Sequence, residues 1–116
     1  MDYFENPSIL VSGDGINFFE EKPGLNPLAA PPLVDHNDDP DLFIYDKNYN
    51  ILYLETHRPE KQNLILLSST DRINWTSRMI HTDYLTGNNS DPFILSPSFL
   101  SDVTGDYLFY VSKNTP

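Results

Sequence analysis

The sequence SGDGINF at residues 12–18 returns as STDRINW at residues 69–75, and the two copies start 57 positions apart. Both read serine, any residue, aspartate, any residue, isoleucine, asparagine and then an aromatic residue. Asp-Gly in the first copy is typical of a tight turn between antiparallel strands, because glycine accepts a positive φ. The phrase therefore predicts one turn written twice. Arg72 takes the position of Gly15 in the second copy, so that turn is either of another type or strained.

Further blocks of sequence agree at the same offset without a gap. The matched blocks are 9–12 with 66–69, 40–42 with 97–99, and 51–54 with 108–111. A fixed period over several blocks indicates a repeated structural unit rather than one repeated turn. We therefore expect one supersecondary unit for every 57 residues.

Within one period, short runs of aromatic and β-branched residues alternate with turn residues, which predicts strands. The expected strands are residues 41–45, 51–56, 63–68 and 75–81. No amphipathic helix pattern interrupts them. Four antiparallel strands in a period of this length are typical of a β-propeller blade. The predicted fold is therefore all-β, a β-propeller fragment built of four-stranded antiparallel blades.

The period divides the chain into a half blade at residues 1–30, a whole blade at 38–85 and a half blade at 90–116, within a single partial domain. Phe18 and Trp75, at matching positions, are expected to fill the space between blades. Propellers close with at least four blades, and fewer would leave exposed strand edges. We therefore expect further blades, either from a longer parent chain, which we prefer, or from self-association of several copies.

Composition limits the partners. The chain carries 17 acidic and 7 basic residues, a net charge of −10, so a phosphate backbone would be repelled and no nucleic-acid partner is expected. It has no cysteine, which excludes disulfides and thiolate metal sites. No run of apolar residues is long enough to span a membrane. The first residues lack the basic and apolar regions of a signal peptide, which favours a cytoplasmic or virion-associated location over secretion.

Several motifs, spread over nearly the whole chain, resemble one enzyme family. They are Asn6-Pro7-Ser8-Ile9, the phrase at 12–18, Asn26-Pro27-Leu28, HNDDPDL at 36–42, Leu52-Tyr53-Leu54, and Ser69-Thr70-Asp71 with Trp75. Their order and spacing resemble the five-bladed propeller glycosidases of the arabinanase, levansucrase and invertase superfamily, with glycoside hydrolase family 43-like proteins nearest. More narrowly, the chain resembles propeller proteins of bacteria and their phages.

The resemblance implies a catalytic set of three carboxylates from successive blades, acting as base or nucleophile, pKa modulator and general acid. Asp39 or Asp41 matches the first acid, and Asp41 is preferred by its place in the repeat. At the same offset Asp41 falls on Ser98, where the superfamily commonly has an acid. The third acid would come from a blade outside this chain. Whether the protein is an enzyme therefore stays open.

The resemblance predicts a glycosidase-like propeller fragment that acts on or binds a polysaccharide and is incomplete for catalysis alone. The alternative is a non-catalytic glycan-binding or virion-surface interaction module. Asp39 and Asp41 would then cap the strand by accepting backbone N–H bonds. His36, Glu55 and Arg58 are candidates to bind a sugar, although residues of these types also occur as ordinary solvated groups at strand ends.

The acidic group formed by Asp35, Asp38, Asp39 and Asp41 raises calcium as a secondary hypothesis. Carboxylate oxygens are the ligands that calcium prefers, but the spacing is not that of an EF-hand. No metal site and no other cofactor are expected.

Overall fold

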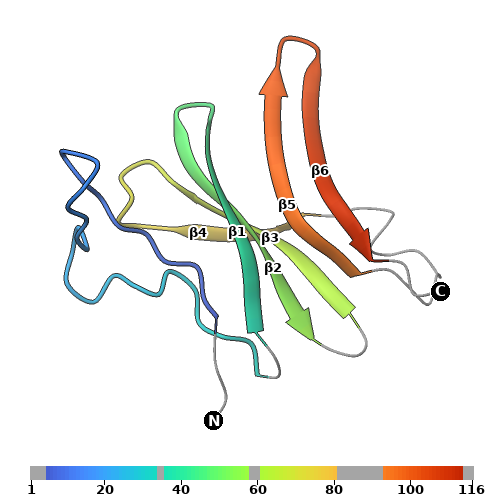
Figure 1. Cartoon of the computed structure of the whole chain (residues 1–116), viewed down its shortest axis with the longest axis horizontal. Helices are drawn as coiled ribbons and strands as arrows, with labels where there is room; N and C mark the ends of the chain where they lie inside the picture. The colour runs from blue at the N-terminus through green and yellow to red at the C-terminus, as the bar shows by residue number, and fades with distance from the viewer. Residues whose placement is uncertain (1–4, 34–35, 58–60, 81–92, 114–116) are drawn as a thin grey trace.

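The computed structural model describes residues 5–33, 36–57, 61–80 and 93–113 of the chain. Its strands are β1 (His36–Tyr45), β2 (Asn48–His57), β3 (Lys61–Ser69), β4 (Thr76–Ile80), β5 (Phe93–Asp102) and β6 (Gly105–Lys113). The first four form one antiparallel sheet in the order β1-β2-β3-β4, and β5 and β6 form a separate hairpin (Figure 1). The all-β prediction is confirmed. Among the residues described there is no helix that could cross a membrane.

The strand β1 begins at His36, earlier than the predicted start at residue 41. Its pairing with β2 shifts register between Asp38 and Asp41, and Asp39 has a positive φ of 51°. This irregularity has the form of a β-bulge, which carries Pro40 through the strand without requiring the ladder hydrogen bond that proline cannot donate. The strand predicted at residues 41–45 excludes Pro40, whereas the bulge makes Pro40 part of β1.

The core of the protein lies on both faces of β2 and β3. Alternate side chains form two clusters: Leu52, Leu54, Leu64 and Leu66 on one face, and Ile51, Tyr53, Ile65 and Leu67 on the other. Successive side chains of a strand point to opposite faces, so a strand covered on both sides needs a continuous apolar run. The predicted runs at residues 51–56 and 63–68 meet this requirement.

Different parts of the chain cover the two clusters. Phe99 and Leu108 of the β5–β6 hairpin pack on the first, and Phe99 stacks on Phe43 with 4.3 Å between ring centroids. Leu28 and Trp75 pack on the second, on the side of residues 5–33. The sheet therefore separates the N-terminal segment from the C-terminal hairpin (Figure 1).

The backbone repeats at the offset seen in the sequence, and we call residues 57 positions apart counterparts. The β5–β6 pairing shifts register between Leu95 and Ser98, which are the counterparts of Asp38 and Asp41. Ser96 has a φ of 49°, almost the value of its counterpart Asp39. The bulge is therefore formed twice, at matching positions, although the two sequences differ there.

The N-terminal segment, residues 5–33, contains one isolated bridge between Val11 and Phe19. Their counterparts, Ser68 and Thr76, pair where β3 turns into β4. The segment thus reproduces the start of the β3–β4 pairing but not its full length. Phe18 is exposed, so the prediction that it fills an interior space is wrong within this chain, whereas its counterpart Trp75 packs on the second cluster.

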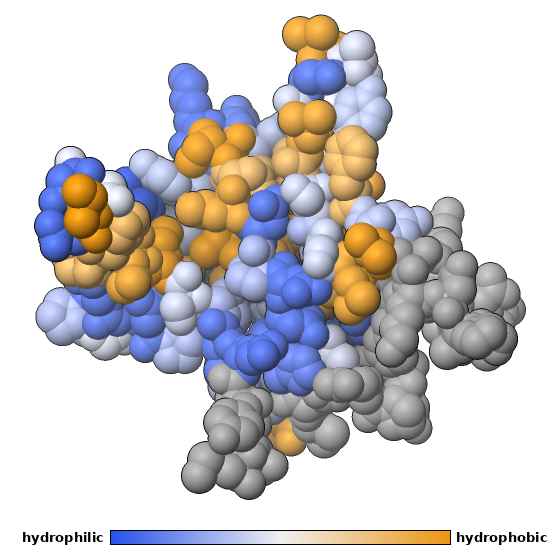
Figure 2. Space-filling model, viewed as in Figure 1, coloured by the Kyte–Doolittle hydropathy of each residue, from blue (hydrophilic) through white to orange (hydrophobic). Residues whose placement is uncertain are grey.

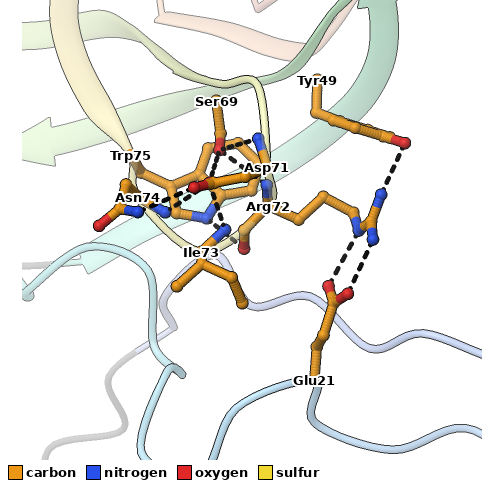
Figure 3. A network of polar contacts seen from close by, with 8 residues as sticks. All are labelled: Glu21, Tyr49, Ser69, Asp71, Arg72, Ile73, Asn74 and Trp75. Carbon is orange, nitrogen blue, oxygen red and sulfur yellow. Dashed lines mark hydrogen bonds and ion pairs between the residues drawn. The ribbon is translucent and has the colours of Figure 1, made fainter.

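The repeated phrase forms the same turn in both copies, and Figure 3 shows the second of them. Asp71 Oδ1 accepts the backbone N–H groups of Ile73 at 2.9 Å and Asn74 at 2.8 Å, and Ser69 Oγ accepts the N–H of Arg72 at 2.8 Å. Asp14 and Ser12 make the same bonds in the first copy. These backbone hydrogen bonds hold the pKa of Asp14 and of Asp71 below the usual range. The phrase needs serine, aspartate and asparagine because each side chain closes part of the turn.

Arg72 adopts the turn conformation of Gly15, with a φ of 65° against 75°, so the second turn is of the same type with a side chain in a strained position. Its guanidinium donates to both carboxylate oxygens of Glu21, at 2.9 and 2.7 Å, and to the hydroxyl of Tyr49 at 2.7 Å (Figure 3). These contacts offset the unfavourable φ and tie the N-terminal segment to the sheet.

Candidate functional site

The candidate site lies at one end of the four-stranded sheet, where β1 begins, β2 ends and β3 begins. We call this the polar end; its residues are His36, Asn37, Asp38, Glu55, Thr56, Gln62 and Asn63. The register places His36 opposite Thr56, and Thr56 opposite Gln62. The predicted residues His36 and Glu55 belong to this end, whereas Arg58 lies outside the described residues.

Asp38 is the central residue on the face of the polar end that continues the first cluster. One of its carboxylate oxygens lies 2.9 Å from His36 Nε2, and the Thr56 hydroxyl donates to it from 3.4 Å. Gln62 donates to the same hydroxyl at 3.4 Å. Burial raises the pKa of Asp38, and the neighbouring His36 opposes that shift. Asp38 is therefore a half-buried carboxyl in a hydrogen-bonded group.

The opposite face of the polar end carries Asn37 and Glu55. The buried Asn37 amide donates to Asn6 Oδ1 at 3.0 Å and to the Ala30 carbonyl at 3.1 Å, and Asn63 donates to Glu55 at 3.0 Å. Asn37 Oδ1 is buried without a hydrogen-bond partner among the described residues. Because neighbouring residues of a strand alternate, His36 and Glu55 lie on different faces and do not form one site.

Asp39 and Asp41 lie at the junction between β1 and β5. Asp39 accepts the backbone N–H of Ser96 at 2.7 Å. Asp41 accepts the backbone N–H of Phe99 at 3.0 Å, and the Ser98 hydroxyl lies 3.4 Å from the same oxygen. Both carboxylates thus cap backbone donors, on the neighbouring hairpin rather than on their own strand. A catalytic role for either residue stays a prediction.

From the sequence, Asp38 is expected only as a member of the acidic group considered for calcium. Its pairing with His36 follows from their spacing of two residues on one strand, which places both side chains on the same face. The sequence indicates the pairing of Asp38 with His36 only if residues 36–40 are part of the strand. Identifying Thr56, on the neighbouring strand, as the other partner of Asp38 requires the register between β1 and β2.

A metal site is not apparent in the parts of the chain that the structure describes: no three histidine, aspartate or glutamate side chains there are arranged to hold an ion. Asp35, one of the four residues considered for calcium, lies outside those parts. The calcium hypothesis therefore stays a prediction.

A second feature is an open groove of about 300 Å³ between the sheet and the hairpin. Its floor is formed by Leu64 and Leu66 of β3, its far wall by Phe99 and Leu108, and Arg78 lies at its border. The groove is mainly apolar and continues the first cluster beyond the part that β5 and β6 cover.

Comparisons with known proteins found no match for this chain among family models, curated proteins or solved structures. The geometry and chemistry of the site are therefore the basis for its functional interpretation.

Proposed function

We propose that the chain forms one complete blade and parts of two others in a β-propeller, and that its polar end binds a carbohydrate. The observation that carries the proposal is the repetition of backbone form at one offset. The bulge and the turn each occur twice, at counterpart positions, and the isolated bridge has its counterpart in the β3–β4 pairing. A four-stranded antiparallel sheet with partial copies of itself on both faces is the arrangement expected of neighbouring blades.

Binding is supported better than hydrolysis. Glycoside hydrolysis generally uses two carboxylates placed about the bond to be broken. Asp39 and Asp41 each accept a backbone N–H already, and their counterparts are Ser96 and Ser98, so the hairpin supplies no second acid at these positions.

The polar end has suitable chemistry for a neutral sugar. Asp38, Thr56 and His36 offer carboxylate, hydroxyl and imidazole groups on one face of the sheet. A carboxylate accepts hydrogen bonds from sugar hydroxyls, and such charge-assisted bonds are stronger than neutral ones. An uncharged ligand is also compatible with a net charge of −10.

A glycan array probed with the full chain, followed by calorimetric titration of the best ligand, tests this function. Replacing Asp38 with asparagine removes the charge from one ligand contact and should weaken binding about 10-fold or more. Asp46→Asn, at the β1–β2 turn, is a control that should bind normally. Absence of glycan binding, or equal affinity of Asp38→Asn and the parent, would refute the assignment.

A second candidate is a family 43-like glycosidase that requires further blades. The raised pKa of Asp38 favours it, because a half-buried carboxyl with a raised pKa suits a general acid. Aryl arabinosides and xylosides, offered to a parent protein that supplies further blades, would test it. Loss of turnover in Asp41→Asn or Asp38→Asn would support the respective residue, and unchanged turnover would remove it from the mechanism.

A further inference from the structure

Two parts of the chain expose apolar side chains whose counterparts are buried. Phe109 of β6 is 58% exposed, against 3% for its counterpart Leu52. Leu10 of the N-terminal segment is 53% exposed, against 3% for its counterpart Leu67. Figure 2 shows hydrophobic residues at the surface of both the hairpin and the N-terminal segment. In the complete sheet, Leu52 is buried in the cluster that the β5–β6 hairpin covers, and Leu67 is buried in the cluster that Leu28 and Trp75 cover.

The backbone of the N-terminal segment has one bonded side and one open side. Val11 exchanges both of its hydrogen bonds with Phe19, at 2.9 and 3.0 Å. The Asn26 side chain bonds the N–H and carbonyl of Ile9, at 2.8 and 2.7 Å. Backbone groups of successive strand residues point to opposite sides. Leu10 therefore directs its N–H and carbonyl away from this side, where the described residues offer it no partner.

The strand β6 has the matching open edge. Within the described residues it pairs with β5 alone, whereas its counterpart β2 pairs on both sides. The N-terminal segment of the same chain does not reach this edge, because the four-stranded sheet lies between the two (Figure 1). The open edge of β6 and its complement in the N-terminal segment can therefore meet between two copies of the chain.

We propose that residues 7–12 of a second copy add to the open edge of β6 as β3 adds to β2, which associates the chains head to tail. The β2–β3 register, in which Ile51 pairs with Leu67, is the template. Transferred by the repeat offset, it pairs Leu108 with Leu10 of the second copy.

The side chains at this junction are complementary. In the complete sheet Asn50 and Ser68 form a cross-strand hydrogen bond of 2.7 Å. Their counterparts on the two open edges are Tyr107 and Val11, an aromatic and a β-branched residue, which favour each other across an antiparallel pair. Residues 7–12, PSILVS, carry no charge, so the strand adds without local repulsion. The added strand also covers the groove that Leu64, Leu66 and Leu108 leave open.

Head-to-tail addition uses two different surfaces of each copy. Such an interface produces a ring if the rotation between copies closes and an open series if it does not. The association involves no carbohydrate, so it stands or falls separately from the proposed function.

The mass of the full chain in solution, measured by sedimentation equilibrium over a range of concentrations, is the first test. The mass should rise from 13.3 kDa to at least twice that value as concentration increases. Leu10→Lys places a charge in the junction and should keep the chain monomeric at every concentration. Ile16→Lys is the matched control, since Ile16 is an exposed apolar residue of the same segment outside the paired strand. A wild-type monomer throughout, or equal loss of association in both variants, would overturn the proposal.

Cross-linking tests the register and does not depend on the behaviour of the lysine variants. The chain has no cysteine, so single cysteines report cleanly. Facing residues of antiparallel strands have Cα atoms about 4.5–5.5 Å apart, within the range for a disulfide, whereas a slip of two residues adds about 7 Å along the strand. Mixing Leu10→Cys with Leu108→Cys should give a covalent dimer under oxidation, and mixing Ser8→Cys with Leu108→Cys should not. The reverse result, or equal cross-linking, would overturn the proposed pairing.

Discussion

The hairpins β1–β2 and β5–β6 have the same backbone form and different surroundings. Each carries a bulge at the same place, with a φ of 51° at Asp39 and 49° at Ser96. Leu54 of β2 is fully buried, whereas its counterpart Val111 of β6 is exposed. Local sequence therefore suffices to form the hairpin, but the burial that stabilises it depends on neighbouring elements. Leu64 and Leu66 of β3 and the β5–β6 hairpin enclose the cluster of Leu54, whereas β6 pairs only with β5 among the described residues.

The largest expected difference between the two hairpins is in the cost of truncating a side chain. Leu54→Ala should lower the free energy of unfolding by about 2–5 kcal/mol, because it leaves a cavity in the core. Val111→Ala should change it by less than about 0.5 kcal/mol, because the side chain is exposed. Chemical denaturation at low protein concentration, where copies do not associate, gives both values. Equal costs would contradict the view that only β2 is enclosed.

The bulge of β1 is expected to matter through its contact with β5. Asp39→Ala removes the acceptor of the Ser96 N–H and should cost about 1–3 kcal/mol, since the bond is to a charged group. Asp39→Asn keeps an acceptor and a residue type that tolerates a positive φ, so it should cost less. Hydrogen exchange of the Ser96 amide, faster in Asp39→Ala than in Asp39→Asn, is the direct measurement. Unchanged protection in both variants would show that Asp39 does not hold the hairpin.

The two copies of the turn differ in what they connect. Asp71 closes the turn between β3 and β4, whereas Asp14 closes a turn that carries only the Val11–Phe19 bridge. Asp71→Ala should therefore lower the melting temperature more than Asp14→Ala, although the two lose the same hydrogen bonds. Thermal melts of both variants test this order. A larger effect at Asp14 would show that residues 5–33 contribute more to stability than their single bridge indicates.

The pH dependence of stability should show two opposite contributions. The pKa values of Asp14 and Asp71 are lowered, so the stability that these residues contribute is present above the ordinary pKa of aspartate and is lost as pH falls through the folded-state values. The pKa of Asp38 is raised, so its contribution is present at acid pH and is lost as pH rises through the folded-state value.

Denaturation curves from about pH 2 to pH 8 check both signs. Asp38→Asn should flatten the decline on the neutral side of the profile, and Asp71→Asn should flatten the acid side. Asp102 offers a control for the acid side of the profile. Its pKa is also lowered, by hydrogen bonds from Thr104, but it lies at an exposed hairpin tip outside the two repeated turns. A profile of Asp38→Asn that matches the wild type would remove burial as the cause of the Asp38 shift.

The smallest effect is expected where the two turns differ, at Arg72 and Gly15. Arg72→Gly relieves the positive φ but loses the contacts with Glu21 and Tyr49, so the net change in stability should be small. A double-mutant cycle of Arg72→Gly with Glu21→Gln isolates the ion pair. The coupling should shrink between low and high salt, because the pair is partly exposed. Coupling that is independent of salt would point to a structural rearrangement instead.

The sequence by itself determined the period, the strands and the turns. The hydrogen bonds of the Ser-x-Asp-x-Ile-Asn phrase join residues within the phrase. Its geometry therefore follows from the local sequence in both copies. The apolar runs of β2 and β3 required cover on both faces, and the structure supplies it. The sequence does not predict the bulge at Asp39, since a proline such as Pro40 is typical of a strand boundary unless the pairing with β2 is known.

Only the tertiary structure decided what the candidate site residues contact. Asp39 and Asp41 bond to Ser96 and Phe99, which are distant in sequence and come near only because the hairpin packs against the sheet. Burial of Asp38 likewise depends on packing, which no local pattern encodes. Hydrogen bonds within a turn are fixed by the residues that form it, whereas burial and long-range contacts depend on which elements meet, and that is a property of the whole fold.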